Sequence, residues 1–277
     1  MPELPELEIV CEVLRRRVAG RTIARVDVAP KGGPIVIRDL TGHGFSAQLT
    51  GSTITSVERR GKFLLFAFES SDLRLAVNPK LSGRLQLCTP GAKKAGPVQV
   101  TLQLSEPREE LRYVDAKTMG QLYLTQSLAA IPTFAEMGPD ALAVDLHTFR
   151  QRLRSFRGEI KGILVREQFL AGIGNAYADE ILWAARLHPF RKRTSLSPEE
   201  IDRLYEAMCS TLRESLEKVR AEMGDQIHLK PRDFFAVHMR ADQSCPRCGT
   251  AISAITADQR ITNFCRTCQP GGLIRGM

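Results

Sequence analysis

The chain has 277 residues, a formal net charge of +8 and 43% hydrophobic residues. This length allows two domains with separate cores, and the composition fits a soluble globular protein. Apolar runs fall short of the roughly 20 residues that span a bilayer, and the N-terminus lacks the order of a signal peptide. We therefore expect a cytoplasmic protein without membrane contact, and the basic balance favours a polyanionic partner.

The first residues, Met1-Pro2-Glu3-Leu4-Pro5-Glu6, have two interpretations. Proline and carboxylates are good first-turn residues, and the apolar spacing that follows predicts an amphipathic helix as far as Val18. Alternatively, removal of Met1 would leave Pro2 with a secondary amine that can attack a sugar C1′ and give an iminium, with Glu3 placed to move a proton. Composition alone favours the capping role.

The next hundred residues contain short, alternating or β-branched segments separated by turn residues, which predict an antiparallel sandwich or barrel. The expected strands are 22–28, 52–59, 62–69, 73–77, 84–88, 98–105 and 111–115. Lys62 opens a very apolar strand, where a lysine is usually solvated. The loop at 78–83 should expose Lys80 and Leu81, and a leucine beside a lysine can act either as ordinary surface or as a wedge between stacked bases.

The pattern weakens between residues 128 and 145, where we place a linker after an N-terminal domain of residues 1–127. Beyond it the sequence predicts helices over 146–156, 160–170 and 176–187, and a long helix from the cap at Ser197 to about Met223. The Gly-x-Gly turn at 171–175 can present N–H groups and Asn175 to a phosphate, but many helix pairs use such a turn without a ligand.

The most specific motif is Cys245-x2-Cys248 followed by Cys265-x2-Cys268. This spacing predicts a tetrahedral four-cysteine zinc site on a β-hairpin. Four thiolates leave no position for water, so we expect one structural Zn²⁺ and not a catalytic metal. Arg260 lies on the intervening hairpin, where it is either simply solvated or a phosphate ligand.

Together these features resemble the family of formamidopyrimidine-DNA glycosylase and endonuclease VIII, enzymes of base-excision repair. The segments that carry the resemblance are Met1–Glu6, Arg60–Leu65, Leu170–Glu180 and Arg260–Gln269. The resemblance implies an α+β multidomain fold: an N-terminal helix with an antiparallel β-sandwich, a helix-two-turn-helix domain over residues 146–236, and a four-cysteine zinc finger over 237–277. It also implies that DNA binds in the cleft between the domains.

The resemblance also assigns roles to individual residues. It makes Pro2 the Schiff-base nucleophile, Glu3 the proton donor for sugar-ring opening, Lys62 a phosphate contact that assists β-elimination, and Arg260 a phosphate clamp linked to δ-elimination. The other residues expected at the DNA are Glu6, Lys80, Leu81, Lys117, Met119, Lys161 and Asn175. The expected partner is damaged double-stranded DNA, bound by a monomer.

Three departures from the family pattern concern the lesion. Asn78 and Leu81 replace a histidine and a methionine, and Lys117-Thr118-Met119 replaces the Arg-Arg-Phe that reads the opposite base. The segment 230–240 is shorter than the loop that covers 8-oxoguanine in the formamidopyrimidine-DNA glycosylases. A fork of arginine donors for cytosine is thus missing, and we expect formamidopyrimidines, hydantoins or oxidised pyrimidines rather than strictly 8-oxoguanine opposite cytosine.

The leading hypothesis is a bifunctional DNA glycosylase and abasic-site lyase that removes oxidised bases and then cleaves the strand by β,δ-elimination. The alternative is a non-catalytic or lyase-only protein of the same fold that binds damage or abasic sites, although a pure binder has no need of an amine beside an acid. A zinc-ribbon nucleic-acid binder with an unrelated N-terminal domain is a third, weaker hypothesis. We expect the protein in the bacterial cytoplasm, associated with the nucleoid when bound to DNA.

Overall fold

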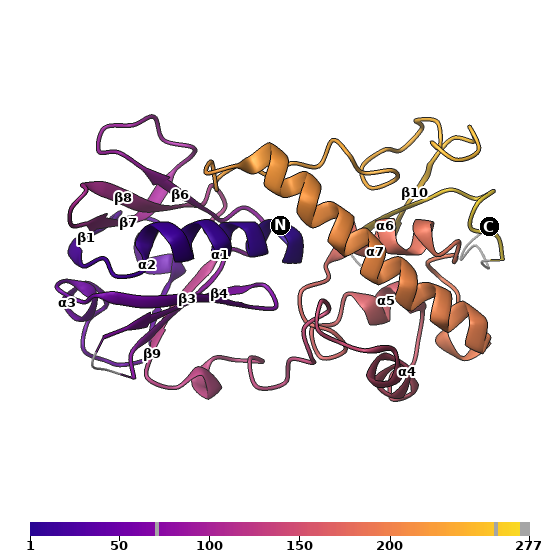
Figure 1. Cartoon of the computed structure of the whole chain (residues 1–277), viewed down its shortest axis with the longest axis horizontal. Coiled ribbons are helices and arrows are strands. Elements are labelled where there is room, and N and C mark those ends of the chain that lie inside the picture. Colours follow the sequence, from indigo (N-terminus) through magenta and orange to yellow (C-terminus); the bar gives the residue numbers. More distant parts are fainter. Residues whose placement is uncertain (70–71, 258–259, 272–277) are drawn as a thin grey trace. The chain divides into compact units, whose positions relative to one another are not determined.

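The structure is a computed structural model that describes residues 1–69, 72–257 and 260–271 (Figure 1). It divides into two compact units, each with its own core. Unit 1 comprises Met1–Glu136 and Val219–Pro231, and unit 2 comprises Met137–Lys218 and Arg232–Met277. Among the described residues, every helix is too short or too polar to cross a bilayer.

The described residues of unit 1 form two sheets. The order is β1-β7-β8-β6 in the four-stranded sheet and β2-β9-β5-β4-β3 in the five-stranded sheet. Only the β2–β9 pair is parallel among the strand pairs of these two sheets. The strands are β1 (Ile23–Val28), β2 (Ile37–Asp39), β3 (Ile54–Arg60), β4 (Phe63–Phe68), β5 (Arg74–Asn78), β6 (Arg84–Cys88), β7 (Val98–Leu104), β8 (Glu109–Val114) and β9 (Gln121–Thr125).

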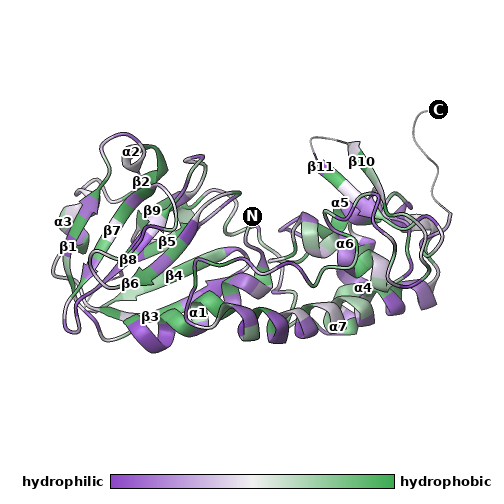
Figure 2. Cartoon of the chain, turned by 90° about the horizontal axis from the view of Figure 1, so that it is seen from above, coloured by the Kyte–Doolittle hydropathy of each residue, from purple (hydrophilic) through white to green (hydrophobic). Residues whose placement is uncertain are grey.

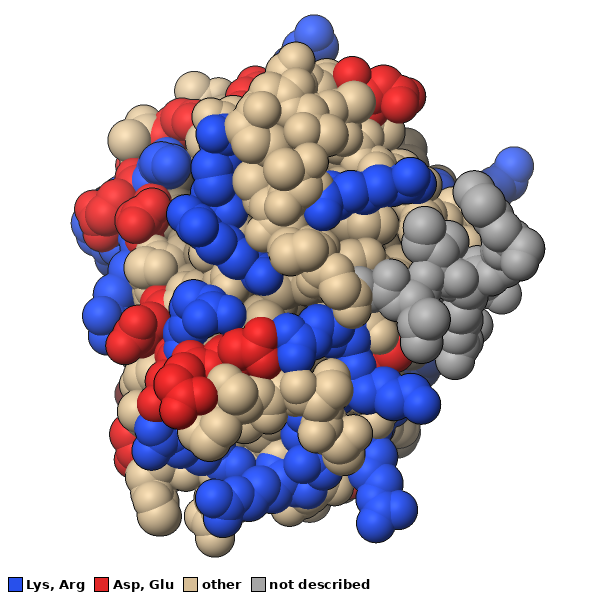
Figure 3. Space-filling model, turned by 90° about the vertical axis from the view of Figure 1, so that its right-hand side faces the viewer, with Lys and Arg blue, Asp and Glu red and all other residues tan. Residues whose placement is uncertain are grey.

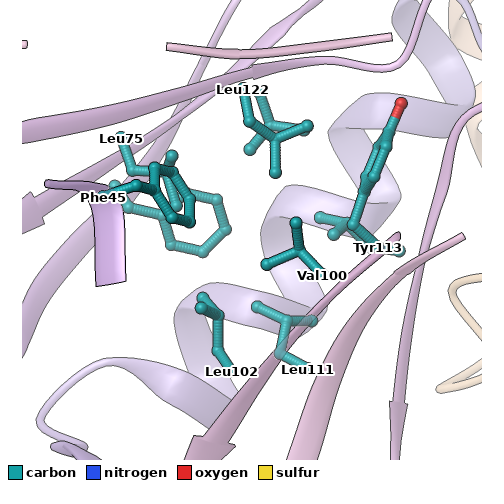
Figure 4. Close-up of a pocket in the computed structure, with 10 residues that line it drawn as sticks. Phe45, Leu75, Val100, Leu102, Leu111, Tyr113 and Leu122 are labelled. Atoms are coloured by element: carbon teal, nitrogen blue, oxygen red, sulfur yellow. The ribbon is translucent and has the colours of Figure 1, made fainter. Parts of the chain in front are cut away.

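Apolar side chains from both sheets fill the space between them. Leu75 and Leu122 come from the five-stranded sheet, and Val100, Leu102 and Leu111 from the four-stranded sheet (Figure 4). All five are at most 5% exposed, so each contributes about 1.5–3 kcal/mol of burial free energy. The Tyr113 ring lies among them, with its hydroxyl oxygen at the end away from Leu102 and Leu111 (Figure 4).

Helix α1 (Leu4–Val18) packs along β3. The Cys11 Sγ–H donates to the Val57 carbonyl at 3.5 Å, and nearer the helix start Glu8 pairs with Arg59. Residue numbers rise along β3 as they fall along α1. The first turn of α1 therefore lies toward the end of β3, where the chain turns into β4.

Unit 2 is built from helices and a hairpin, with α4 beginning at an Asp145 cap whose Oδ1 accepts from the Thr148 N–H at 2.7 Å. Apolar residues recur every three or four positions along α7 and are buried, which gives the striped helix in Figure 2. The elements are α4 (Leu146–Arg154), α5 (Ile160–Leu164), α6 (Asn175–Ala184), β10 (Ser253–Ala257), β11 (Arg260–Phe264) and most of α7 (Pro198–Met223), whose residues from Val219 onward belong to unit 1.

Most expected strands and helices are present, and the differences are local. The sequence did not predict β2, β9 or the short elements α2 (Gly33–Val36), α3 (Phe45–Leu49), η1 (Leu128–Ala130) and η2 (Arg193–Ser195). The helix expected over 160–170 ends at Leu164, so that prediction was too long. The reason is that the carbonyl of Glu167 accepts a hydrogen bond from the Gly138 N–H at 2.8 Å, which takes this segment out of the helical pattern.

Candidate active site and metal centre

The start of α1 is buried. Glu3, the N-cap residue, is 2% exposed and Glu6 is 1% exposed, and Pro2 is also buried. The two glutamates form a capping box, in which the Glu3 backbone N–H donates to Glu6 Oε2 at 2.9 Å. Capping therefore occurs, as composition predicted. A cap does not require two buried carboxylates, and burial of an anion is costly.

Lys62 lies in the two-residue turn between β3 and β4. Arg60 pairs with Phe63, and Gly61 has φ +57°, a conformation that a glycine accepts at the first position of a tight hairpin turn. Lys62 is only 7% exposed, so the expectation of a solvated lysine is wrong. A lysine is rarely buried to this extent unless it is paired. The direction of α1 along β3 places this turn at the same end of unit 1 as Glu3.

Two neighbouring loops of unit 1 present the residues expected at the base stack. Leu81 is 52% exposed and Met119 is 47% exposed. Lys117 is also exposed, whereas Lys80 is half-buried and not fully exposed as expected. The cause is local: Asn78 is buried, and its Oδ1 accepts from the Lys80 N–H at 3.2 Å, which folds the loop back on the strand end.

In unit 2, the expected phosphate ligands of α5 and α6 converge on the hairpin strand β11. The Asn175 Nδ2 donates to the carbonyl of Ile261 at 2.8 Å. The Lys161 Nζ donates to Thr262 Oγ1 at 2.8 Å and forms an ion pair with Asp179 at 2.6 Å. Lys161 is 5% exposed, so its ammonium group stabilises the hairpin from inside. Arg260 begins the same strand and is exposed.

Two buried acids, to which the sequence assigned no role, hold the segment before the zinc finger. Asp179 also contacts His238 Nδ1 at 2.8 Å and accepts from the Asn263 N–H at 3.2 Å. The Glu180 carboxylate accepts backbone N–H groups of residues 236, 237 and 238 at 2.7, 2.9 and 2.8 Å. Burial raises the pKa of Glu180, and these three donors oppose that rise. Both acids lie within residues 170–180. Apart from Lys161, the partners of these two acids lie about 60 to 80 residues further along the chain.

The four cysteines of the zinc motif converge as expected. Their sulfur atoms all lie within 4.8 Å of one another, with Cys245 to Cys268 at 3.9 Å and Cys248 to Cys265 at 3.4 Å. A tetrahedral site with Zn–S bonds of about 2.3 Å requires sulfur separations of about 3.8 Å, so the four thiolates fit one Zn²⁺. The Trp183 Nε1–H donates to Cys245 Sγ at 3.4 Å and orients this ligand. The zinc is structural.

The basic side chains do not form one continuous stripe on the face drawn in Figure 3. On the face drawn in Figure 3, Lys and Arg side chains form several separate groups, with Asp and Glu between them. Surface pairs such as Arg150 with Asp202 neutralise part of the basic charge.

Comparisons with known proteins agree with this assembly of parts. Residues 1–122 match the formamidopyrimidine-DNA glycosylase N-terminal domain, residues 137–225 match the H2TH domain of the same enzymes, and residues 242–271 match the zinc finger found in FPG and IleRS. The chain therefore contains three domains in this order: a sandwich, a helix-two-turn-helix domain and a four-cysteine zinc finger. Proteins with this set of domains form one class that shares a fold.

Relatives and solved structures then identify the family. The formamidopyrimidine-DNA glycosylase of Symbiobacterium thermophilum is 35% identical and covers 98% of this chain and 90% of that protein, and that of Chloroflexus aurantiacus is 36% identical over 97% and 98%. The crystal structure of Lactococcus lactis Fpg with DNA containing an abasic site has a TM-score of 0.85 at 29% identity, covering 97% and 100% of the two chains. The chain belongs to the formamidopyrimidine-DNA glycosylase family, which confirms the resemblance.

Proposed function

We propose that this protein is a bifunctional DNA glycosylase and abasic-site lyase, which excises oxidised bases from damaged duplex DNA through a Schiff base on Pro2. Membership of the formamidopyrimidine-DNA glycosylase family supports the activity. The observation that carries the mechanism is the burial of Glu3, Glu6 and Lys62 at one end of unit 1, beside the residue that becomes N-terminal when Met1 is removed. Buried acids and a buried lysine in one place are typical of a site where protons move.

The chemistry begins when the Pro2 nitrogen attacks C1′ of the damaged nucleotide, and the C1′–base bond breaks with its electron pair leaving on the base, which takes up the proton that the Pro2 nitrogen loses. The C1′–O4′ bond then opens to give the iminium, and Glu3 supplies the proton that O4′ takes up. Loss of a C2′ proton expels the 3′ phosphate, and loss of a C4′ proton expels the 5′ phosphate. Water finally releases Pro2 from the sugar fragment.

Lys62 and Arg260 supply positive charge to these eliminations, because each step expels a phosphate. Lys80, Lys117 and Asn175 are proposed to hold the DNA backbone, and Lys161 to hold the hairpin that presents Arg260. Glu6 is proposed to lie near the flipped base. Leu81 and Met119 are proposed to fill the space that the flipped nucleotide leaves.

The opposite base should matter less than in an enzyme with an arginine fork. Thr118 and Met119 offer no bidentate donor for cytosine. We therefore propose formamidopyrimidines, hydantoins or oxidised pyrimidines as the preferred lesions, bound by a monomer. A protein with this function works in the cytoplasm, at the nucleoid when it is bound to DNA.

The proposed mechanism is tested by the state of the N-terminus. Protein with a native terminus should excise a formamidopyrimidine from a duplex and cleave the strand, whereas an uncleaved N-terminal extension should abolish both steps because it converts the amine of Pro2 to an amide. The same extension at the C-terminus is the matched control and should leave both steps unchanged. Normal cleavage by the N-terminally extended protein would exclude Pro2 as the nucleophile.

A further inference from the structure

The two loops that carry Leu81 and Met119 lie side by side because of the strand order. Residues 79–83 connect β5 to β6, and residues 115–120 connect β8 to β9, with Asp115 at the base of the second loop, residues 116–120. Asn78 pairs with Gln121 in the five-stranded sheet, and Arg84 pairs with Val114 in the four-stranded sheet. Both loops therefore cross from one sheet to the other at the same end of the sandwich, and one group placed between them can hold both.

The Asp115 carboxylate is that group. It is 1% exposed, and donors from both loops converge on it. Its Oδ1 accepts from the Ser82 hydroxyl of the first loop and from the Lys117 N–H of the second at 3.1 Å. Its Oδ2 accepts from the Gly120 N–H at 2.8 Å and from the Tyr113 hydroxyl at 3.1 Å. One side chain thus links the 79–83 loop, the 116–120 loop and a tyrosine of the core.

Tyr113 fixes Asp115 relative to the core and contacts both loops. A Cβ added to Gly83 would lie 2.1 Å from the Tyr113 hydroxyl oxygen, and one added to Gly120 would lie 1.6 Å from it. Neither glycine is among the residues with positive φ, so space and not conformation requires glycine at these positions. Burial, together with the neighbouring Asp115, raises the pKa of Tyr113, so its hydroxyl remains a donor.

The loops need such an anchor because each contains a strained residue next to its exposed apolar side chain. Lys80 has φ +49° and precedes Leu81, and Thr118 has φ +50° and precedes Met119. Non-glycine residues keep this conformation only where surrounding contacts enforce it. With Leu81 and Met119 half-exposed, these contacts must come from the base of the loops.

We propose that Asp115 is a positioning residue that holds Leu81 and Met119 as one preorganised apolar wedge for the space vacated by a flipped nucleotide. The inference rests on the proposed function for the wedge itself and adds the residue that aims it. A wedge whose geometry is fixed before binding avoids the entropic cost of ordering two loops on the DNA. The proposal predicts that a change at Asp115 affects DNA distortion without touching the amine chemistry.

The test is Asp115→Asn, which keeps the size of the side chain but replaces one acceptor oxygen by an amide nitrogen. The first readout is the fluorescence of 2-aminopurine next to a tetrahydrofuran abasic analogue in a duplex, which reports unstacking. The second is single-turnover excision of a formamidopyrimidine from a duplex. We expect a roughly tenfold loss in excision rate and a reduced fluorescence rise, with unchanged cleavage of a single-stranded abasic site, which needs no wedge.

A variant cycle separates positioning from general destabilisation. Asp115→Asn should have no further effect in a Leu81→Ala, Met119→Ala background, since the wedge is then already absent. Ser82→Ala removes the hydroxyl that donates to Asp115 and accepts from the Lys117 N–H at 3.3 Å, but leaves the other donors to Asp115 in place, and should give a smaller effect of the same kind. An equal loss from Asp115→Asn with and without the wedge residues, or an equal loss on single strands, would overturn the proposal.

The fluorescence readout keeps this inference separate from the proposed function. Wild-type protein that unstacks the reporter but forms no product contradicts the Pro2 mechanism, and Asp115→Asn still tests the wedge. Conversely, if Asp115→Asn changes neither fluorescence nor excision rate in an active enzyme, the positioning role is wrong and the Pro2 mechanism stands.

Discussion

Unit 1 and the zinc finger of unit 2 hold their proposed functional residues in different ways. In unit 1 the start of α1 and the Lys62 turn are supported by a helix and two sheets with a large apolar core. The apolar cluster around the zinc finger is built on only four buried residues, Val237, Cys245, Ile252 and Cys265. The finger depends instead on thiolate ligands and on the polar contacts of Asp179 and Glu180. The fold around the start of α1 and the Lys62 turn should therefore persist when the metal is lost, whereas the fold of the zinc finger should not.

Removal of zinc should have the largest effect and should be confined to the finger. A structural Zn²⁺ in a small finger contributes on the order of 10 kcal/mol to its folding, and two of the four buried residues of the cluster, Cys245 and Cys265, are themselves metal ligands. We expect chelation, or Cys265→Ser, to abolish tight duplex binding while the strand signal in circular dichroism persists. The control is Cys209→Ser on α7, a cysteine outside the metal cluster. Loss of the strand signal on chelation would contradict the division of roles between the two regions.

Glu3→Gln should give the next largest effect, at the other region. The amide keeps the size and can still cap the helix, but it cannot deliver a proton, so product formation should fall by roughly 10³-fold, about 4 kcal/mol. Thermal unfolding should change little. Glu58→Gln, an exposed carboxylate on β3, is the control and should be silent. Full activity of Glu3→Gln would mean that Glu3 only caps the helix and does not supply a proton.

How much of this was visible in the sequence depends on the range of each contact. Most of the strands and the four cysteines follow from short-range patterns and were predicted, whereas β2 and β9 were not. The burial of Lys62 was not predicted, because a lysine at a strand edge is usually solvated and only the packing of α1 on β3 shows otherwise. The bond from Ser82 to Asp115 and the contacts of Asp179 with residues 238 and 263 join distant segments, and no local pattern marks them.

Asp179→Asn should weaken the attachment of the finger by about 3 kcal/mol. It removes the charge that pairs with Lys161 at 2.6 Å and leaves a buried ammonium group without its anion. Hydrogen exchange should accelerate in residues 236–264 and stay unchanged in the sandwich. Asp202→Asn is the matched control, because its partner Arg150 is 43% exposed and such pairs contribute less than about 1 kcal/mol. Equal effects of the two changes would refute the polar attachment of the finger.

The smallest effect concerns the cap of α7. Hydrogen bonds from Arg191 lower the pKa of Glu200, which also accepts the Ser197 N–H at 3.0 Å. A carboxyl group with a lowered pKa in the folded state stabilises the fold above its ordinary pKa, and this contribution disappears as the pH falls through the lowered value. Glu200→Gln should therefore cost about 1 kcal/mol at pH 7 and less at a pH below the lowered pKa of Glu200. Thermal melts at both pH values would measure the difference.

Borohydride trapping on a duplex with one abasic site, followed by mass-spectrometric mapping of the adducted peptide, tests the central claim most directly. The account predicts a covalent adduct on the nitrogen of Pro2 in protein that has lost Met1, and no adduct in protein with a blocked terminus. An adduct on Lys62 or another lysine, or no adduct despite tight binding of the duplex, would contradict it and would favour a protein that binds damage without excising it.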